Sequence, residues 1–167
     1  MTAHPNEDRL YASLTALGIA HDVVEHEPVF TVDESADLHE QIAGAHTKNL
    51  FLKDAGGAFW LVTVPCNARV DLKALPAAIG SKRVSFGKAE DMEALLGITP
   101  GSVTPLAAFN DTQAKVQVVI EQSLAAADLV QVHPLRNSAT LGLSGANLLR
   151  ALSDWGHAPI IADIPVL

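Results

Sequence analysis

A lysine inside an apolar strand pattern is the sequence feature that most restricts how this chain can fold. Residues 44–54 run from a polar cluster that contains Lys48 directly into Leu50-Phe51-Leu52. Because side chains alternate between the two faces of a strand, Lys48 shares a face with Leu50 and Leu52. Burying an ammonium group is costly unless it finds a partner. The lysine therefore either reaches solvent along its aliphatic stem, or forms the floor of an anion-binding pocket.

The strand that contains Lys48 opens a predicted β-hairpin, since Asp54-Ala55-Gly56-Gly57 separates it from a second β-rich run. The pattern predicts strands near 19–26, 47–52, 58–64, 82–86, 116–121, 129–133 and 159–164. It predicts helices near 6–17, 34–43, 71–79, 88–96 and 145–155, and a loop over 98–105. Strands and helices do not alternate regularly. We therefore expect one α+β domain over residues 1–167, with a mixed, mostly antiparallel sheet surrounded by helices.

Composition excludes several classes of protein. The 167 residues are 49% hydrophobic and 18% charged, which is typical of a globular chain rather than a disordered one. A single cysteine, Cys66, rules out an internal disulfide. The sequence contains no CxxC or HExxH motif, which are the spacings that would indicate a metal site. No apolar run is long enough for a membrane span, and the N-terminus lacks signal-peptide features. We expect a cytoplasmic protein without metal or cofactor.

The charge is unevenly distributed along the chain. The formal net charge is −8, which argues against general nucleic-acid binding. Residues 48–88, however, hold seven basic and two acidic side chains. A local basic surface on an acidic protein suits a limited anionic contact such as one end of an RNA, although ordinary solvated charges give the same pattern.

Three motifs follow one another along the chain: Gly44-x-His46-Thr47-Lys48-Asn49-Leu50-Phe51-Leu52, Leu96-Gly97-Ile98-Thr99-Pro100-Gly101-Ser102-Val103-Thr104-Pro105-Leu106, and His133-Pro134-x-x-Asn137-x-x-Thr140. Together they resemble the YbaK/ProX family of prolyl-tRNA editing domains. Their order and spacing are similar to those of the family over nearly the whole chain. Within it, the chain most resembles the ProX branch (ProXp-ala), whose members hydrolyse Ala-tRNA(Pro). The YbaK branch acts on Cys-tRNA(Pro).

The resemblance implies roles for particular residues. Lys48 corresponds to the lysine that meets the phosphate and sugar of the terminal adenosine. Gly101 and Pro105 end the GxxxP loop, whose backbone surrounds the aminoacyl group, and His133 helps to position the substrate. The remaining implied substrate-binding residues are Asn49, Ser102, Val103, Thr104, Asn137 and Thr140. The implied partners are the 3′ end and acceptor stem of aminoacyl-tRNA(Pro), with prolyl-tRNA synthetase as a further candidate and the oligomeric state open.

A mechanism without a covalent nucleophile fits these residues. Neither Ser102 nor Ser144 lies in a GxSxG elbow. Ester hydrolysis needs a placed water, donors for the developing oxyanion and orientation, and the GxxxP loop can supply backbone donors. We therefore expect trans-editing hydrolysis assisted by the free ribose hydroxyl of the substrate. Ala36 and Leu38, on the predicted helix 34–43, are candidates for the wall that excludes proline; their alternative role is plain core packing.

Three other functions remain open at this point. A Cys-tRNA(Pro) deacylase could use a similar site. A non-catalytic tRNA- or nucleotide-binding module, or a small-molecule hydrolase, could share the scaffold. Deacylation assays with differently charged tRNA(Pro) separate these functions.

Overall fold

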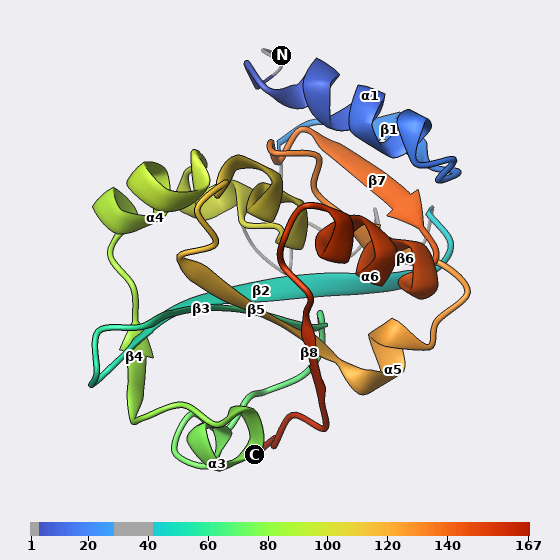
Figure 1. Cartoon of the computed structure of the whole chain (residues 1–167). Coiled ribbons are helices and arrows are strands. Elements are labelled where there is room, and N and C mark those ends of the chain that lie inside the picture. The colour runs from blue at the N-terminus through green and yellow to red at the C-terminus, as the bar shows by residue number, and fades with distance from the viewer. Residues whose placement is uncertain (1–3, 29–41) are drawn as a thin grey trace.

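The computed structural model describes residues 4–28 and 42–167. In chain order the elements are α1 (Glu7–Ala16), β1 (Asp22–Glu25), β2 (Ala45–Asp54), β3 (Phe59–Pro65), α3 (Leu75–Ile79), β4 (Val84–Phe86), α4 (Ala89–Leu96), the 3₁₀ helices η1 (Pro100–Ser102) and η2 (Pro105–Asn110), β5 (Val116–Glu121), α5 (Gln122–Ala125), β6 (Val130–Val132), β7 (Ala139–Leu143), α6 (Gly145–Asp154) and β8 (Ile160–Ala162) (Figure 1). Ala36, Leu38 and most of the helix expected at 34–43 lie outside the described residues.

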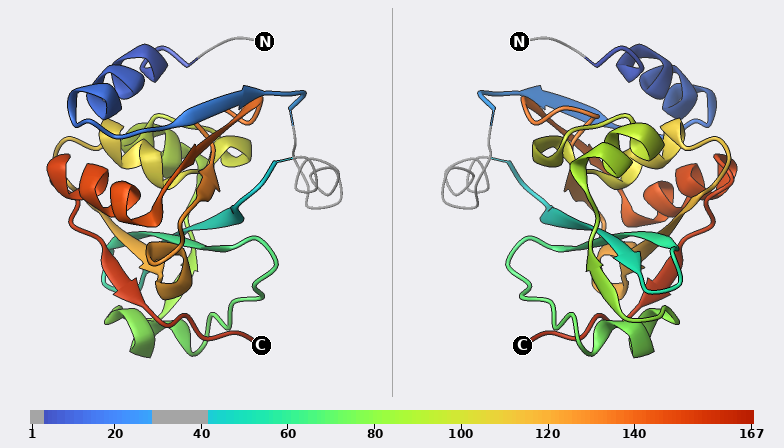
Figure 2. Two further views of the ribbon diagram at one scale, coloured as in Figure 1. Left: turned by 90° about the vertical axis from the view of Figure 1, so that its right-hand side faces the viewer. Right: turned by 90° about the vertical axis from the view of Figure 1, so that its left-hand side faces the viewer.

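The strands of the described residues form one mixed sheet, in the order β1-β7-β6-β2-β3-β5-β8, with β4 paired to β2 outside this path. The pairs β1–β7, β6–β7, β2–β3 and β2–β4 are antiparallel, whereas β2–β6, β3–β5 and β5–β8 are parallel. Helices cover both sides of the sheet (Figures 1 and 2). The predicted α+β fold with a mixed, mostly antiparallel sheet is confirmed.

Alternation along the central strands divides the interior into two cores. On one face, Phe51 and Leu61 pack in a cluster with buried residues of α1, α4, η2 and α6. On the other, Leu52 and Val62 pack with Leu75 and Ile79 of α3. Figure 2 shows α3 on the opposite side of the sheet from α4 and α6. Both faces of β3 are buried, because Leu61 packs in the first cluster and Val62 in the second, which explains its run of apolar residues.

The sequence pattern missed β7 and placed the start of α3 too early. β7 contains Gly142 and small neighbours, so its local strand signal is weak, and pairing with β1 and β6 holds it in place. The Asp71 carboxylate accepts the N–H groups of Lys73 and Ala74, which forms a turn before the helix. The predicted 98–105 loop contains the 3₁₀ helix η1, which starts at Pro100. A second 3₁₀ helix, η2, starts at Pro105, where the predicted loop ends.

Across residues 4–28 and 42–167, the model contains no helix with the length and apolar character that crossing a membrane requires.

The β2–β3 hairpin is closed by a buried carboxylate. Asp54 is 8% exposed, and its oxygens accept the N–H groups of Gly56 (2.9 Å), Ala58 (3.0 Å) and Lys82 (3.3 Å) and the indole N–H of Trp60 (3.1 Å). Burial alone raises the pKa of Asp54, but these donors outweigh it and hold the pKa below its usual range. The charged form is therefore part of the native hairpin.

Replacement of this carboxylate should destabilise the fold. Asp54→Asn leaves one acceptor oxygen for several donors, so we expect a loss of about 1–3 kcal/mol in the free energy of unfolding. Because the folded-state pKa is depressed, the contribution of Asp54 is present above its unfolded pKa of 3.8 and is lost as the pH falls through the folded value. Urea denaturation at neutral and acidic pH measures both effects. Asp71→Asn, which changes a turn carboxylate at the surface, is the control and should cost less.

Candidate active site

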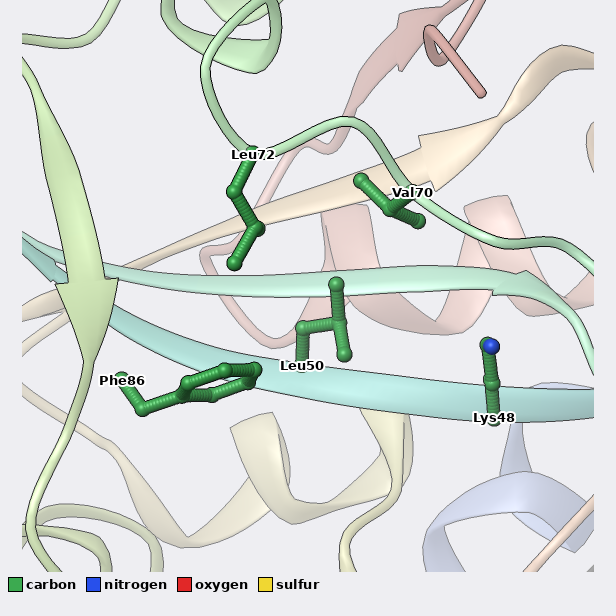
Figure 3. Close-up of a pocket in the computed structure, with 5 residues that line it drawn as sticks. All are labelled: Lys48, Leu50, Val70, Leu72 and Phe86. Carbon is green, nitrogen blue, oxygen red and sulfur yellow. The ribbon is translucent and has the colours of Figure 1, made fainter. Parts of the chain in front are cut away.

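Lys48 lies at the edge of an apolar hollow. Its side chain and that of Leu50 point from β2 toward Val70 and Leu72, and Phe86 of β4 closes the far end (Figure 3). The hollow has a volume of about 170 Å³. No carboxylate among the described residues forms an ion pair with Lys48. The expected shared face with Leu50 is confirmed, and Lys48 as a residue is half-buried.

Strand pairing brings Lys48 to the same part of the sheet as two other predicted site residues. β2 and β6 pair in parallel at Ala45–Val130 and His46–Gln131, and Lys48 and His133 each lie two residues beyond the last of these pairs. The Thr47 hydroxyl donates to the carbonyl of Gln131 at 2.8 Å and keeps the two strands together at this point. β6 and β7 pair up to Val132–Leu141, and His133 and Thr140 are the residues that adjoin this last pair. We call Lys48, His133 and Thr140 the polar row.

The polar row lies on the face of the sheet that is turned away from the larger core. Val130 and Val132 of β6, and Leu141 of β7, belong to that core, so the residues between them point to the opposite face. The packing of Gly142 supports this, because a Cβ atom there would lie 2.8 Å from the side chain of Gln131. Lys48 of β2, Thr140 of β7 and His133, which directly follows β6, thus lie on one face of the sheet.

The ring of His133 is fixed and neutral. Its Nδ1 lies 3.2 Å from the carbonyl oxygen of Ala139, which can only accept, so Nδ1 carries the proton. Burial of the imidazole lowers the pKa of His133; the hydrogen bond to Ala139 opposes this shift, and nearby His26 adds to it. The neutral tautomer leaves Nε2 with an unshared lone pair, which can accept from a water or a hydroxyl group.

Asn49 points to the opposite face and binds the loop that contains the GxxxP motif. Its Nδ2 donates to the carbonyl of Val103 at 3.0 Å, and its Oδ1 accepts from the hydroxyl of Thr63 at 2.6 Å. The amide therefore fixes the position of the loop relative to the neighbouring Lys48. Thr104 is fully buried, and its hydroxyl accepts the N–H of Leu106 at the start of η2.

The predicted site residues therefore fall into two groups. Lys48, His133 and Thr140 form the polar row, while Asn49 holds the 101–105 loop. In that loop Ser102, Thr104 and Pro105 are buried and Gly101 and Val103 are half-buried, so it offers mainly backbone to a ligand. Asn137 is half-buried in the connection between β6 and β7. Among the described residues, no group of three or more His, Cys, Asp or Glu side chains could hold a metal ion.

Sequence reasoning missed Arg136, which holds the β6–β7 connection in place. Its guanidinium binds the buried Glu7 of α1 through Nε at 2.5 Å and Glu25 of β1 through NH2 at 2.9 Å. Hydrogen bonding to Glu7 raises the pKa of Arg136, so the group stays charged. It also donates to the hydroxyl of Ser138 at 3.1 Å. Glu7 and Glu25 lie more than 100 residues from Arg136 in the sequence, so no local pattern could have revealed these two ion pairs.

The His133 side chain should titrate below its ordinary pKa of 6.5. Since the folded state binds the proton less readily than the unfolded chain, stability should fall as the pH drops from 6.5 toward the folded-state value. Proton NMR of the imidazole Cε1–H gives the midpoint, and His133→Asn assigns the signal. A midpoint at or above 6.5 would contradict the buried, neutral ring.

Comparison with known proteins gives a consistent result. Residues 26–151 match the aminoacyl-tRNA editing domain family. Prolyl-tRNA editing protein ProX of Acetoanaerobium sticklandii is 38% identical over 147 residues, covering 87% of this chain and 90% of the relative. Prolyl-tRNA synthetase associated domain-containing protein 1 of Bos taurus is 39% identical over 155 residues, covering 90% of each chain.

The fold has solved counterparts as well. The crystal structure of a protein assigned as a trans-editing enzyme for prolyl tRNA synthetase superposes with a TM-score of 0.72 at 20% identity, covering 98% of this chain and 99% of the other. A hypothetical protein of known crystal structure gives a TM-score of 0.74 at 22% identity, covering 93% and 98%. At these identities the structures support the fold, and the sequence matches establish the relationship. The chain belongs to the aminoacyl-tRNA editing domain family, in the group of prolyl-tRNA editing proteins related to ProX.

Proposed function

We propose that the chain is a trans-editing aminoacyl-tRNA deacylase that hydrolyses Ala-tRNA(Pro). The polar row is the observation that carries this function, because it combines, on one face of the sheet, a lysine that has no ion-pair partner among the described residues with a histidine whose pKa is lowered by burial. Family membership supports the general activity, and a bacterial relative is named for prolyl-tRNA editing. The choice of alanine rests on the resemblance to the ProX branch.

In this mechanism Lys48 binds a phosphate of the terminal adenosine. A lysine ammonium acts as a compact point charge, which suits a phosphate that must be held without bidentate geometry. Lys48 lacks an ion-pair partner among residues 4–28 and 42–167, so no internal salt bridge has to break first. The apolar side chains around its stem limit the positions that the ammonium can reach.

Backbone groups of the 101–105 loop stabilise the oxyanion. Water attacks the carbonyl carbon of the ester, the bond to the ribose oxygen breaks, and that oxygen takes up the proton as alanine leaves. Charge develops on the carbonyl oxygen, where fixed N–H donors are most effective. The Asn49–Val103 hydrogen bond keeps the loop at a constant distance from Lys48, which is the preorganisation that such donors need.

His133 orients the attacking water together with the free hydroxyl of the terminal ribose. Its Nε2 accepts from either group while the ring stays neutral, and the substrate hydroxyl assists the water. This role requires His133 to hold the water in the correct position, and it does not require a strong base. It therefore fits a histidine whose pKa lies below 6.5. The polar groups that the substrate brings replace a protein nucleophile.

Exclusion of proline requires an editing pocket that is separate from the amino-acid pocket of the synthetase and smaller than it. A size difference of about one methylene changes binding by roughly 1–3 kcal/mol, so a synthetase that accepts proline cannot fully reject alanine by fit. An editing pocket too small for proline solves this problem. Ala36 and Leu38 are the proposed wall residues, and Leu38→Ala should then admit larger aminoacyl groups.

Two alternatives give different results in the same assay. A Cys-tRNA(Pro) deacylase would prefer the cysteinyl ester over the alanyl ester. A non-catalytic tRNA-binding module would bind charged tRNA without turnover. Deacylation of Ala-, Cys-, Ser- and Pro-tRNA(Pro), with free amino-acid esters in parallel, separates these functions.

Lys48→Ala should lower kcat/KM for Ala-tRNA(Pro) by about 10²-fold or more, because the 3′ end loses its charged contact. Lys53→Ala is the matched control: it removes a lysine from the same strand, one whose exposed ammonium lies 5.3 Å from the centre of the Phe59 ring. We expect near-normal turnover from this variant. Equal activity of Lys48→Ala and Lys53→Ala would exclude the proposed role of Lys48.

A further inference from the structure

His26, at the end of β1, contacts the polar row from outside the predicted motifs. Its Nε2 lies 2.8 Å from the hydroxyl oxygen of Thr140, and its Nδ1 lies 2.8 Å from the carbonyl oxygen of Glu27. The backbone holds the residue in place, because its N–H donates to the carbonyl of Ser138 at 3.0 Å. Both ring nitrogens of His26 are thus occupied.

These contacts determine the direction of both hydrogen bonds. The carbonyl oxygen of Glu27 has no proton to give, so Nδ1 of His26 is the donor. In the neutral ring, Nε2 is then the acceptor, and the proton between it and Thr140 must come from the hydroxyl. With its only proton committed to His26, the oxygen of Thr140 can do nothing but accept.

We propose that His26 is a positioning residue that fixes the Thr140 hydroxyl as an acceptor, and that this acceptor receives the α-ammonium group of the aminoacyl ester. The inference rests on the proposed deacylase function and extends it to the recognition of the amino group. His26 acts through Thr140 and does not itself touch the substrate.

The chemistry of the polar row agrees with this assignment. Lys48 is a donor only and suits a phosphate, whereas Nε2 of His133 and the oxygen of Thr140 are acceptors. An aminoacyl ester carries one cationic donor, its α-ammonium group. β6 separates β7 from β2 in the sheet, which leaves room for a sugar between Thr140 and Lys48.

The burial of Thr140 makes this contact selective. The residue is 5% exposed, so a substrate group that reaches it gives up water and must find a hydrogen bond there. A free ammonium group offers three donors and a positive charge. An N-acetylated amino group is neutral, bulkier and has one donor, so the site should discriminate against it.

A double-mutant cycle tests the coupling of His26 and Thr140. His26→Ala and Thr140→Val should each lower kcat/KM for Ala-tRNA(Pro) by about tenfold or more, and the double variant should be no worse than Thr140→Val alone. His26→Gln should recover part of the loss, since its amide oxygen can accept from Thr140. Independent, multiplicative losses in the double variant would overturn the proposal.

The substrate arm compares Ala-tRNA(Pro) with N-acetyl-Ala-tRNA(Pro). Wild type should prefer the free amino group, and Thr140→Val should lose most of that preference, whereas Thr140→Ser, which keeps the hydroxyl, should retain it. A preference unchanged in Thr140→Val would overturn the role of Thr140. Thermal unfolding of each variant shows whether a loss of activity reflects loss of fold.

A third measurement does not depend on turnover. Nitrogen-15 NMR of the histidine rings reports the tautomer directly, and we expect the proton of His26 on Nδ1. A proton on Nε2 instead would overturn the His26–Thr140 assignment even in an active enzyme. A wild type without deacylase activity would contradict the proposed function and the ammonium contact together, and the tautomer would still decide the hydrogen bond.

Discussion

The alternation of side chains along β2 is the constraint on which the rest of the site depends. Consecutive residues of a strand point to opposite faces, so Lys48 and Asn49 cannot serve the same surface. Lys48 lies beside the apolar hollow and the polar row, whereas Asn49 binds Val103 through the other face. A single strand thereby connects the lysine that we propose binds phosphate with the loop that we propose surrounds the ester. A shift of one residue in the register of β2 would turn Lys48 to the face of the loop and Asn49 to the face of the hollow. Both the position of the lysine and the hydrogen bond to Val103 would then be lost.

A short parallel contact joins the two halves of the sheet at this point. β2 pairs with β6 over Ala45 and His46, and with β4 only from Leu52 onward. The intervening edge of β2 is where Lys48 lies, beside the connection that carries His133. Arg136 stabilises that connection through Glu7 and Glu25, whose elements are distant in sequence. Among the described residues, the unpaired edge of β2 leaves space for a ligand, while the ion pairs of Arg136 hold the connection that contains His133 in place.

The parts that local chemistry determines could be predicted from the sequence. The turn at 54–57, the shared face of Lys48 and Leu50, and the Ser144 cap of α6 all depend on neighbouring residues. The unpredicted parts depend on contacts across the chain. β7 lacks a strong strand pattern, and the proximity of His26 to Thr140 follows from the register of β1 with β7, across 114 residues. Register over such separations has no local signature.

The electrostatics of the polar row explain how an acidic chain could bind the end of an RNA. The net charge of −8 would repel a polyanion at long range, but solvent and salt screen charges that lie beyond about 8–10 Å. Within that distance the row contributes the cation of Lys48, and the burial that lowers the pKa of His133 keeps the imidazole uncharged. Under the proposed function, the site would need one phosphate contact and neutral acceptors rather than a basic surface. Recognition would then depend on the aminoacyl group as well as on the phosphate, which would favour the charged 3′ end over nucleic acid in general.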